Sequence, residues 1–358
     1  MARKRDLMTP IERAAAYSKG AAIDRLPCVP IVGNTSARVI GVKVSEFRGN
    51  GPLMARAQVE SYRLFGYDNI RIFTDLYTQA ESMGAKVFYP EDETAYLQNP
   101  AIDDERDIGR LKPADPHRDG NLPHFLEAMK IAFGEVGGEV PVTGALTGPF
   151  TNSSFLIGAE KLARLTIQKP EAVCALCEIS LETNLRYAEA IIDVGCAPSL
   201  TDPMSSGTVI SRRNFEAFSL PYLKRLIDYI HGRGKSVTLH ICGKTDKVWD
   251  LMADAGADCL SIDNEASLEG AKLRVGDRVR LMGNVRPSEI MLEGTEEDVA
   301  FAVKKCVSVA HDSPKGFIVA SGCSLPTETP FGNIHAMLDT VREIGYPVET
   351  SRLAAANQ

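Results

Sequence analysis

The stretch SVTLHICGKTDKVWDLMADAGADCLSI, residues 236–262, decides the fold. It opens with an apolar run at 236–241, closes with a second apolar run at 259–262, and carries a helix-like segment at 245–255 between them. Both runs have the length of a buried strand, and the segment between them has the length of a helix. Strand, helix and strand in this order predict two parallel strands of one sheet.

The same alternation extends along most of the chain and predicts the α/β class. Eight strands separated by helix-like segments predict a single closed (β/α)₈ TIM barrel. An open doubly wound sheet is the alternative, but no Gly-x-Gly-x-x-Gly loop follows an early strand, which weakens its dinucleotide-binding version. The predicted strands are residues 28–32, 69–73, 140–146, 198–201, 236–241, 259–262, 279–283 and 317–320, and the predicted helices are residues 52–65, 162–193, 211–233, 245–255 and 296–311.

An N-terminal helical extension and two insertions are expected around this barrel. Thr9-Pro10-Ile11-Glu12 has the pattern of a capping box, and Gly20 is placed to end the helix. Residues 33–51 are expected to form a loop or short helices, and residues 89–119 show no period. No internal repeat, low-complexity tract or linker divides the chain, so residues 1–358 are predicted to be one domain.

Composition excludes several classes of protein. The chain has 358 residues, of which 44% are hydrophobic and 24% charged, as in globular proteins. A formal net charge of -7 argues against nucleic-acid binding. No apolar run reaches the roughly 18 residues of a membrane span, and no apolar core follows the basic start Met1–Asp6. A soluble cytoplasmic protein is expected, with its eight scattered cysteines reduced.

Three residues at the ends of predicted strands have the chemistry of a metal site. His240 and Cys242 are two apart, so they share one face of a strand, and Cys323 follows the last predicted strand. The C-terminal ends of barrel strands are where active sites form. Two thiolates and one imidazole predict a Zn²⁺ ion with one position open, which is typical of catalytic rather than structural zinc.

The alternative is that these cysteines are simply buried, as cysteines often are. Cys259 begins its strand and is expected at the opposite end of the barrel. Cys174 and Cys177 lie in an apolar helical pattern and are interpreted as core residues, and Cys196 and Cys306 give no signal beyond burial. The site prediction therefore depends on the combination of all three strand-end residues.

Several motifs together resemble the uroporphyrinogen decarboxylase superfamily over most of the chain. His240-Ile241-Cys242 with Cys323 resembles the zinc motif of its corrinoid methyltransferase branch. The resemblance implies a (β/α)₈ barrel, a Zn²⁺ ion, and a corrinoid (cobalamin) substrate. Further motifs of the superfamily are resembled by Thr74-Asp75-Leu76, Glu81–Gly84, Gly144–Phe150, Gly283–Pro287, Cys323–Pro330 and Asn333-Ile334.

Two departures distinguish this chain from the decarboxylases. The segment after the first strand, Gly33–Arg38, has one arginine where the decarboxylases have an Arg-rich segment that holds the substrate's carboxylates. Cys323 stands where they have a histidine. Asp75 matches their central aspartate and is predicted to contact substrate. Uroporphyrinogen decarboxylase activity is therefore the least favoured of the functions that the family suggests.

The function expected is methyl transfer between a methyl-Co(III) corrinoid protein and a zinc-activated thiol such as coenzyme M. Zinc deprotonates a coordinating thiol, and the thiolate is the nucleophile. The chain has no Asp-x-His-x-x-Gly motif for holding corrinoid, so a separate corrinoid protein is expected at the barrel mouth. Other predicted site residues are Asp202, Asp263 and Asn284 in the pocket, Glu81 as a fallback fourth ligand, and Arg286 or Lys244 as an anchor for an anionic tail.

Two further hypotheses stay open. Relatives in the superfamily also catalyse the first step, in which a methylated substrate such as an aryl methyl ether, a methylamine or a methyl halide gives its methyl group to corrinoid. Zinc would then polarise the leaving group. A barrel that binds metal or corrinoid protein without turnover is the non-enzymatic alternative. Association into a homodimer is compatible with each hypothesis.

Overall fold

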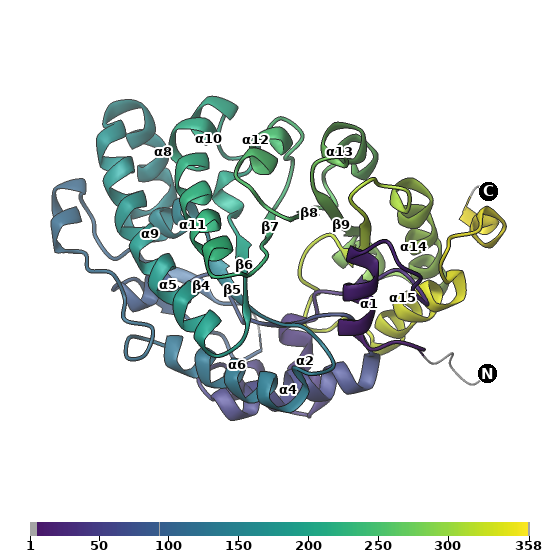
Figure 1. Cartoon of the computed structure of the whole chain (residues 1–358). Helices are drawn as coiled ribbons and strands as arrows, with labels where there is room; N and C mark the ends of the chain where they lie inside the picture. The colour runs from purple at the N-terminus through teal and green to yellow at the C-terminus, as the bar shows by residue number, and fades with distance from the viewer. Residues whose placement is uncertain (1–5, 93, 357–358) are drawn as a thin grey trace.

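Eight parallel strands curl into a TIM-barrel-like sheet, which confirms the predicted fold class (Figure 1). The structure, a computed structural model, describes residues 6–92 and 94–356; the start Met1–Arg5, on which the signal-peptide prediction rests, lies outside them. The order of strands in the sheet is β1-β10-β9-β8-β7-β6-β5-β2. The strands are β1 (Cys28–Val29), β2 (Ile70–Ile72), β5 (Val142–Thr147), β6 (Ala197–Thr201), β7 (Thr238–Ile241), β8 (Cys259–Ile262), β9 (Arg280–Val285) and β10 (Phe317–Ser321).

The sheet does not close by strand pairing. β1 and β2 stand at the two ends of the strand order. A hydrogen bond links them: the amide of Asp68, just before β2, donates to the carbonyl of Cys28 in β1 at 2.9 Å. Each of the eight predicted strands is present, but the ladder is a curled half-barrel with a seam between its first two strands. The division into one domain stays a prediction.

Helices follow most strands and cover the outside of the sheet (Figure 1). Two predicted helices are each split, because a proline restricts the residue before it and lacks an amide hydrogen. α8 ends before Lys169-Pro170, and α11 starts at Leu220-Pro221. The helices are α1 (Pro10–Ser18), α2 (Ser36–Val39), α3 (Val44–Arg48), α4 (Gly51–Phe65), α5 (Thr78–Ser82), α6 (Leu122–Val136), α7 (Pro149–Ile157), α8 (Ala159–Gln168), α9 (Pro170–Asp193), α10 (Arg212–Phe218), α11 (Leu220–Gly232), α12 (Trp249–Asp254), α13 (Leu268–Val275), α14 (Glu296–Ala310) and α15 (Phe331–Ile344).

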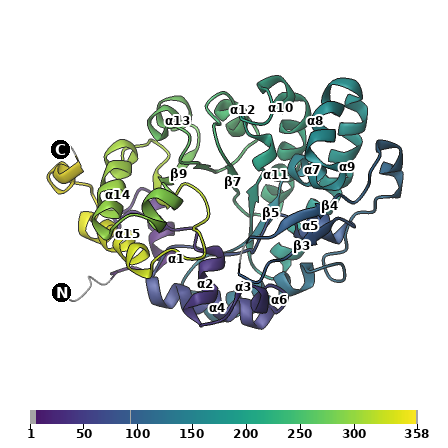
Figure 2. The ribbon, with the colours of Figure 1, turned by 180° about the vertical axis from the view of Figure 1, so that it is seen from behind.

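The sequence prediction missed α5, α6, α7, α13, α15 and a small hairpin. The hairpin pairs β3 (Lys86–Phe88) with β4 (Tyr96–Asn99) and lies beside α5, at the edge of the molecule away from the C-terminus (Figure 2). The insertion at 89–119, whose sequence shows no period, therefore carries β4 and a short helical turn. Short helical turns complete the chain: η1 (Gly33–Thr35), η2 (Glu105–Arg110), η3 (Pro203–Ser205), η4 (Pro287–Leu292) and η5 (Thr350–Ala356).

The two faces of the strands differ, and this difference creates the site. On β7, Leu239 and Ile241 are fully buried in the large apolar cluster between sheet and helices. His240, between them, points to the barrel interior. One side of that interior is apolar, with Val29, Ile31, Cys259, Met282 and Ala320 packed together. The remaining inner face offers hydroxyl, amide and charged groups, so polar ligands have room inside the barrel.

A buried ionic network fastens α1 under the barrel. The capping box of α1 is present as predicted, with Thr9 and Glu12 bonded to each other's amides. Arg13, which has no exposed surface, pairs with Asp24 at 2.7 Å and with Asp68. Arg25 pairs with Asp68 at 2.6 Å. These pairs connect α1 to the segment before β2. Within the described residues, no helix is long and apolar enough to cross a membrane.

Candidate metal centre and its pocket

Four ligating side chains meet at the C-terminal ends of the strands. His240 lies in β7 and Cys242 directly follows it, Asp263 directly follows β8, and Cys323 comes two residues after β10. One ligand atom from each lies within 4.8 Å of every other. The structure thus brings together the three residues predicted to bind metal and adds the carboxylate of Asp263, which sequence reasoning had placed only in the pocket.

The imidazole of His240 is oriented for metal binding through Nε2. Its Nδ1 lies 3.2 Å from the carbonyl oxygen of Ser261 and 3.1 Å from the hydroxyl of the same residue. Because a carbonyl oxygen only accepts, Nδ1 carries the proton and donates it. Nε2, the ring nitrogen left for a metal, faces Cys242 Sγ at 3.2 Å. A ligating histidine ordinarily donates its other nitrogen in this way.

The two thiols are unequal in acidity. A hydrogen bond from Cys242, followed by the influence of His240, lowers the pKa of the Cys323 thiol well below its usual value. The same hydrogen bond and burial raise the pKa of Cys242. Two sulfurs, one imidazole nitrogen and one carboxylate oxygen form a donor set that suits zinc.

A cavity of about 220 Å³ lies over this centre. Its walls come from the loops that follow β1, β2 and β10, and from the last residues of β5, β6 and β7. Phe73, Leu76 and Leu325 supply apolar wall, while Asp75 and the two cysteines supply polar wall. The volume fits a small molecule of a few heavy atoms.

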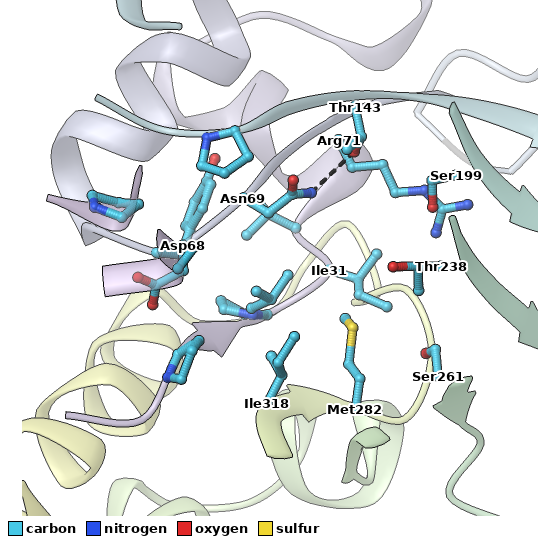
Figure 3. Close-up of a pocket in the computed structure, with 18 of the residues that line it drawn as sticks. Ile31, Asp68, Asn69, Arg71, Thr143, Ser199, Thr238, Ser261, Met282 and Ile318 are labelled. Atoms are coloured by element: carbon cyan, nitrogen blue, oxygen red, sulfur yellow. Dashed lines mark hydrogen bonds between the residues drawn. The ribbon is translucent and has the colours of Figure 1, made fainter. Parts of the chain in front are cut away.

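Arg71 is the residue that sequence reasoning missed. It lies in β2, lines the cavity over the centre, and also lines a second cavity of about 170 Å³ deeper in the barrel (Figure 3). Burial lowers its pKa to about 10, against the opposing influence of Cys323 and Cys242. The signal was present: Arg71 stands between Ile70 and Ile72, so alternation places it on the inner face.

Three of the remaining predicted residues lie at or beside the pocket. Asp263 is buried in the ligand group. Asn284 donates to the carbonyls of Asp263 and Ala266, both at 3.0 Å, so it holds the Asp263 backbone in place. Asp75 lines the pocket, and its carboxylate accepts from the Tyr77 amide at 2.8 Å. Their predicted roles remain predictions.

The other four predicted residues are not part of the pocket wall. Asp202 is fully buried, accepts from the Thr151 amide at 2.9 Å, and has its pKa raised by burial. Glu81 accepts a hydrogen bond from Asn121 at 3.0 Å and is absent from the ligand group. Asp263, rather than Glu81, supplies the carboxylate near the two cysteines. Arg286 is half exposed and pairs with Glu289 at 3.0 Å, and Lys244 is exposed. The turns after β7 and β9 direct these two side chains outward.

Of the other cysteines, Cys177 is buried as predicted, while Cys174, also interpreted as a core residue, is partly buried; Cys28, Cys196, Cys259 and Cys306 are buried as well. Cys259 lies in the apolar cluster inside the barrel, two residues before Ser261. Cys259 pairs with Thr238 of β7, which comes two residues before His240. Cys259 therefore lies one layer of side chains below the candidate metal centre.

Residues 9–344 match the family described as Uroporphyrinogen decarboxylase (URO-D). The chain belongs to this family. Within it, the chain is 27% identical over 332 residues to the methylcobamide:CoM methyltransferase MtaA of Methanosarcina barkeri strain Fusaro, covering 91% of this chain and 95% of the relative. A solved structure of a methyltransferase from Methanosarcina mazei superposes with a TM-score of 0.85 at 26% identity, over 94% of this chain and 99% of the other.

Overall identity does not separate the two activities of the family. The chain is also 29% identical over 298 residues to a uroporphyrinogen decarboxylase of Carboxydothermus hydrogenoformans, covering 82% of this chain and 83% of the relative. The level of identity is similar for both kinds of relative. The side chains of the metal centre must therefore decide between them.

Proposed function

We propose that this chain is a zinc-dependent methyltransferase that moves a methyl group from a methyl-Co(III) corrinoid protein to a thiol. One observation carries the proposal: two cysteine sulfurs and an oriented histidine nitrogen meet under a cavity that fits a small thiol. Relatives named as methylcobamide:CoM methyltransferases align over nearly the whole chain, which supports it further.

His240, Cys242 and Cys323 would hold the metal, with the carboxylate of Asp263 in reach of the same point. When bound, zinc lowers the pKa of a thiol that coordinates it and keeps its sulfur as a thiolate. The side chains around it do the rest. Ser261 fixes the His240 ring, Asn284 fixes the Asp263 backbone, and Phe73, Leu76 and Leu325 shield the sulfur from water.

The transfer balances as a displacement at carbon. The thiol loses its proton to solvent on binding, and a sulfur electron pair then forms the new carbon–sulfur bond. The electron pair of the cobalt–carbon bond stays on cobalt, which leaves as Co(I). Sulfur is methylated, and neither oxidant nor reductant is consumed. The corrinoid belongs to a separate protein that presents its methyl group at the barrel mouth.

The cavity argues against porphyrinogen decarboxylation. A substrate with many carboxylates needs several cations, as the Arg-rich segment of the decarboxylases indicates. Among the described residues that line the cavity, Arg71 is the single arginine or lysine. Arg38, the one arginine of the segment after β1, donates instead to the carbonyls of Thr327 and Thr329 at 3.1 and 3.0 Å.

The test is an anaerobic assay of methylcobalamin with zinc-loaded protein and a panel of small thiols. The proposal predicts thiol-dependent loss of the methylcobalamin spectrum and formation of a methyl thioether. Cys323→Ser should abolish the reaction, and Cys259→Ser, which removes a barrel cysteine away from the centre, should retain it. If no thiol promotes Co(I) formation, while a methylated donor methylates added Co(I), the first-step function replaces this one.

A further inference from the structure

Arg71 is a charged side chain placed inside the barrel. Figure 3 shows it extending from β2 toward Ser199, above the deeper cavity that Ile31, Thr238 and Met282 also line. One guanidinium nitrogen donates to the hydroxyl of Thr201, and the guanidinium carbon lies 5.0 Å from the centre of the Phe73 ring. These two contacts hold the group beside the metal centre.

No carboxylate compensates this cation. Within residues 6–92 and 94–356, no ion pair joins Arg71 to an aspartate or glutamate, and its buried Nε has no hydrogen-bond partner. A buried charge without a partner is costly, and the buried arginines Arg13, Arg25 and Arg48 each have an aspartate partner. Arg71 lines the same cavity as Cys323 and Cys242.

The charges of the proposed centre leave a place for this cation. A zinc ion and two cysteine thiolates sum to zero, the carboxylate of Asp263 in the same group brings the sum to -1, and a thiolate from the substrate brings it to -2. Inside a partly enclosed cavity, that charge is poorly solvated. The guanidinium of Arg71, which lines the same cavity, offsets the charge that the substrate thiolate adds.

We infer that Arg71 is the counter-cation of the thiol-loaded centre, a positioning residue that lets the metal accept a third sulfur as a thiolate. This inference rests on the proposed function. It assigns Arg71 to the reacting sulfur rather than to the tail of the substrate, so its effect does not depend on whether the thiol carries a second charge. Thr201 and Phe73 serve to hold the guanidinium at the right depth.

The test measures thiol binding without methyl transfer. The protein is loaded with Co²⁺ in place of zinc, and the thiolate-to-metal charge-transfer absorption is titrated with 2-mercaptoethanol, whose tail is uncharged. Arg71→Gln, which keeps a donor toward Thr201 but loses the charge, should weaken binding at least about tenfold, as expected for removing one member of a buried charge pair. Arg71→Lys keeps the charge and should stay within about threefold of the original protein. Metal content should be equal in all three.

Three results overturn the inference. The first is equal affinity of Arg71→Gln and the original protein for 2-mercaptoethanol. The second is a loss confined to mercaptoacetate, whose carboxylate would mark Arg71 as an anchor for an acidic tail. The third is the absence of any charge-transfer band in the original protein, which would remove the proposed function as well. If Arg71→Gln does not fold, as judged by circular dichroism, Arg71→Met is titrated in its place with the same expected loss.

Discussion

A cysteine inside a protein is ordinarily a small apolar residue, and most of the cysteines of this chain behave so. Cys242 and Cys323 differ because their sulfurs lie close to each other at the ends of strands. The imidazole of His240 and the carboxylate of Asp263 lie within reach of the same point. Burial alone would raise the pKa of both thiols. Their mutual hydrogen bond instead separates the two pKa values, which prepares one sulfur to lose its proton first.

The first prediction at this scale concerns the metal ligands. Cys323→Ser should lower zinc affinity by more than about 100-fold, since loss of a supporting group alone typically costs 10–100-fold. Zinc content after dialysis, measured by atomic emission, should be about one per chain in the original protein and near zero in the variant. Cys259→Ser is the matched control and should retain zinc. Equal zinc in both variants would exclude Cys323 as a ligand.

The second prediction concerns the hydrogen bond that orients His240. Ser261→Ala removes the hydroxyl acceptor of Nδ1 but leaves the carbonyl of the same residue. Zinc affinity should therefore fall by about tenfold, the low end of the range for such groups. Competition with a chromogenic chelator gives the measurement. Ser199→Ala alters the barrel interior at another residue and should leave zinc affinity unchanged. A similar loss of zinc affinity in both variants would show a general destabilisation of the barrel instead of an effect on His240.

The sequence predicted that His240, Cys242 and Cys323 would meet, and it did so for a physical reason. Two-residue periodicity and the ends of strands fix which side chains enter the barrel mouth, and His240, Cys242 and Cys323 obey both. Arg286 and Lys244 come after their strands have ended, where the turn decides direction, and no sequence pattern reveals that the chain turns them to solvent. The inward direction of Arg71 follows from the alternation of β2, but a charged side chain is ordinarily expected on the outside of a protein, so its place in the barrel was missed.

At the scale of elements, long periodic features were predictable and their interruptions were not. The capping box of α1 and the full span of α14 follow from local sequence. The breaks before Pro170 and Pro221 leave helical periodicity intact on both sides, so one helix was predicted where two exist. The β3–β4 hairpin was missed because its strands are short and mostly exposed, so they lack an apolar run.

The prediction for this scale concerns the attachment of α1. Arg13→Met should lower the free energy of unfolding by about 3–5 kcal/mol, because it leaves the carboxylate of Asp24 without its ion-pair partner and Asp68 with Arg25 alone. Arg63→Met removes an arginine of a surface ion pair and should cost at most about 1 kcal/mol. Urea unfolding followed by circular dichroism measures both values. Equal, small losses would show that the buried network does not fasten the helix.

The effect of Arg13→Met should also depend on pH. Burial opposes the ionisation of Asp24, but hydrogen bonds from Arg13 outweigh it and hold the pKa of Asp24 below its usual value. A lowered pKa in the folded state contributes stability above the unfolded pKa of about 3.9 and loses it as the pH falls toward the folded value. The difference between the original protein and the variant should therefore narrow below about pH 4. A constant difference down to pH 3 would contradict this account.

The whole molecule is a curled sheet with one seam. β1 and β2 meet through the backbone hydrogen bond from the Asp68 amide to the carbonyl of Cys28, while β7 and β8 pair along their whole length. Amides of the segments 28–32 and 69–73 should therefore exchange with deuterium faster than those of β7 and β8, because strand ends with few partners open more easily. Mass spectrometry of peptic fragments tests this. Equal protection from exchange in β1, β2, β7 and β8 would contradict this prediction and show that the seam is as stable as the rest of the sheet.

The seam also lies next to the functional part of the barrel. β2 carries Arg71, and the loops after β1 and β2 form part of the pocket wall. A corrinoid protein that docks at the mouth would contact these loops. The eight-stranded architecture was predictable because each strand has its own apolar run. The position of the seam between β1 and β2 was not, because it depends on the lengths of these strands, which apolar runs do not determine.

The central claim is that the open position of the metal centre receives sulfur, and X-ray absorption at the zinc edge tests it most directly. Zinc-loaded protein should show two sulfur neighbours and two lighter ones, and a saturating thiol should raise the sulfur count to three. Cys323→Ser, if any zinc remains, should show one fewer in each state. Two sulfur neighbours with and without a thiol, in protein that still transfers methyl groups, would contradict the account.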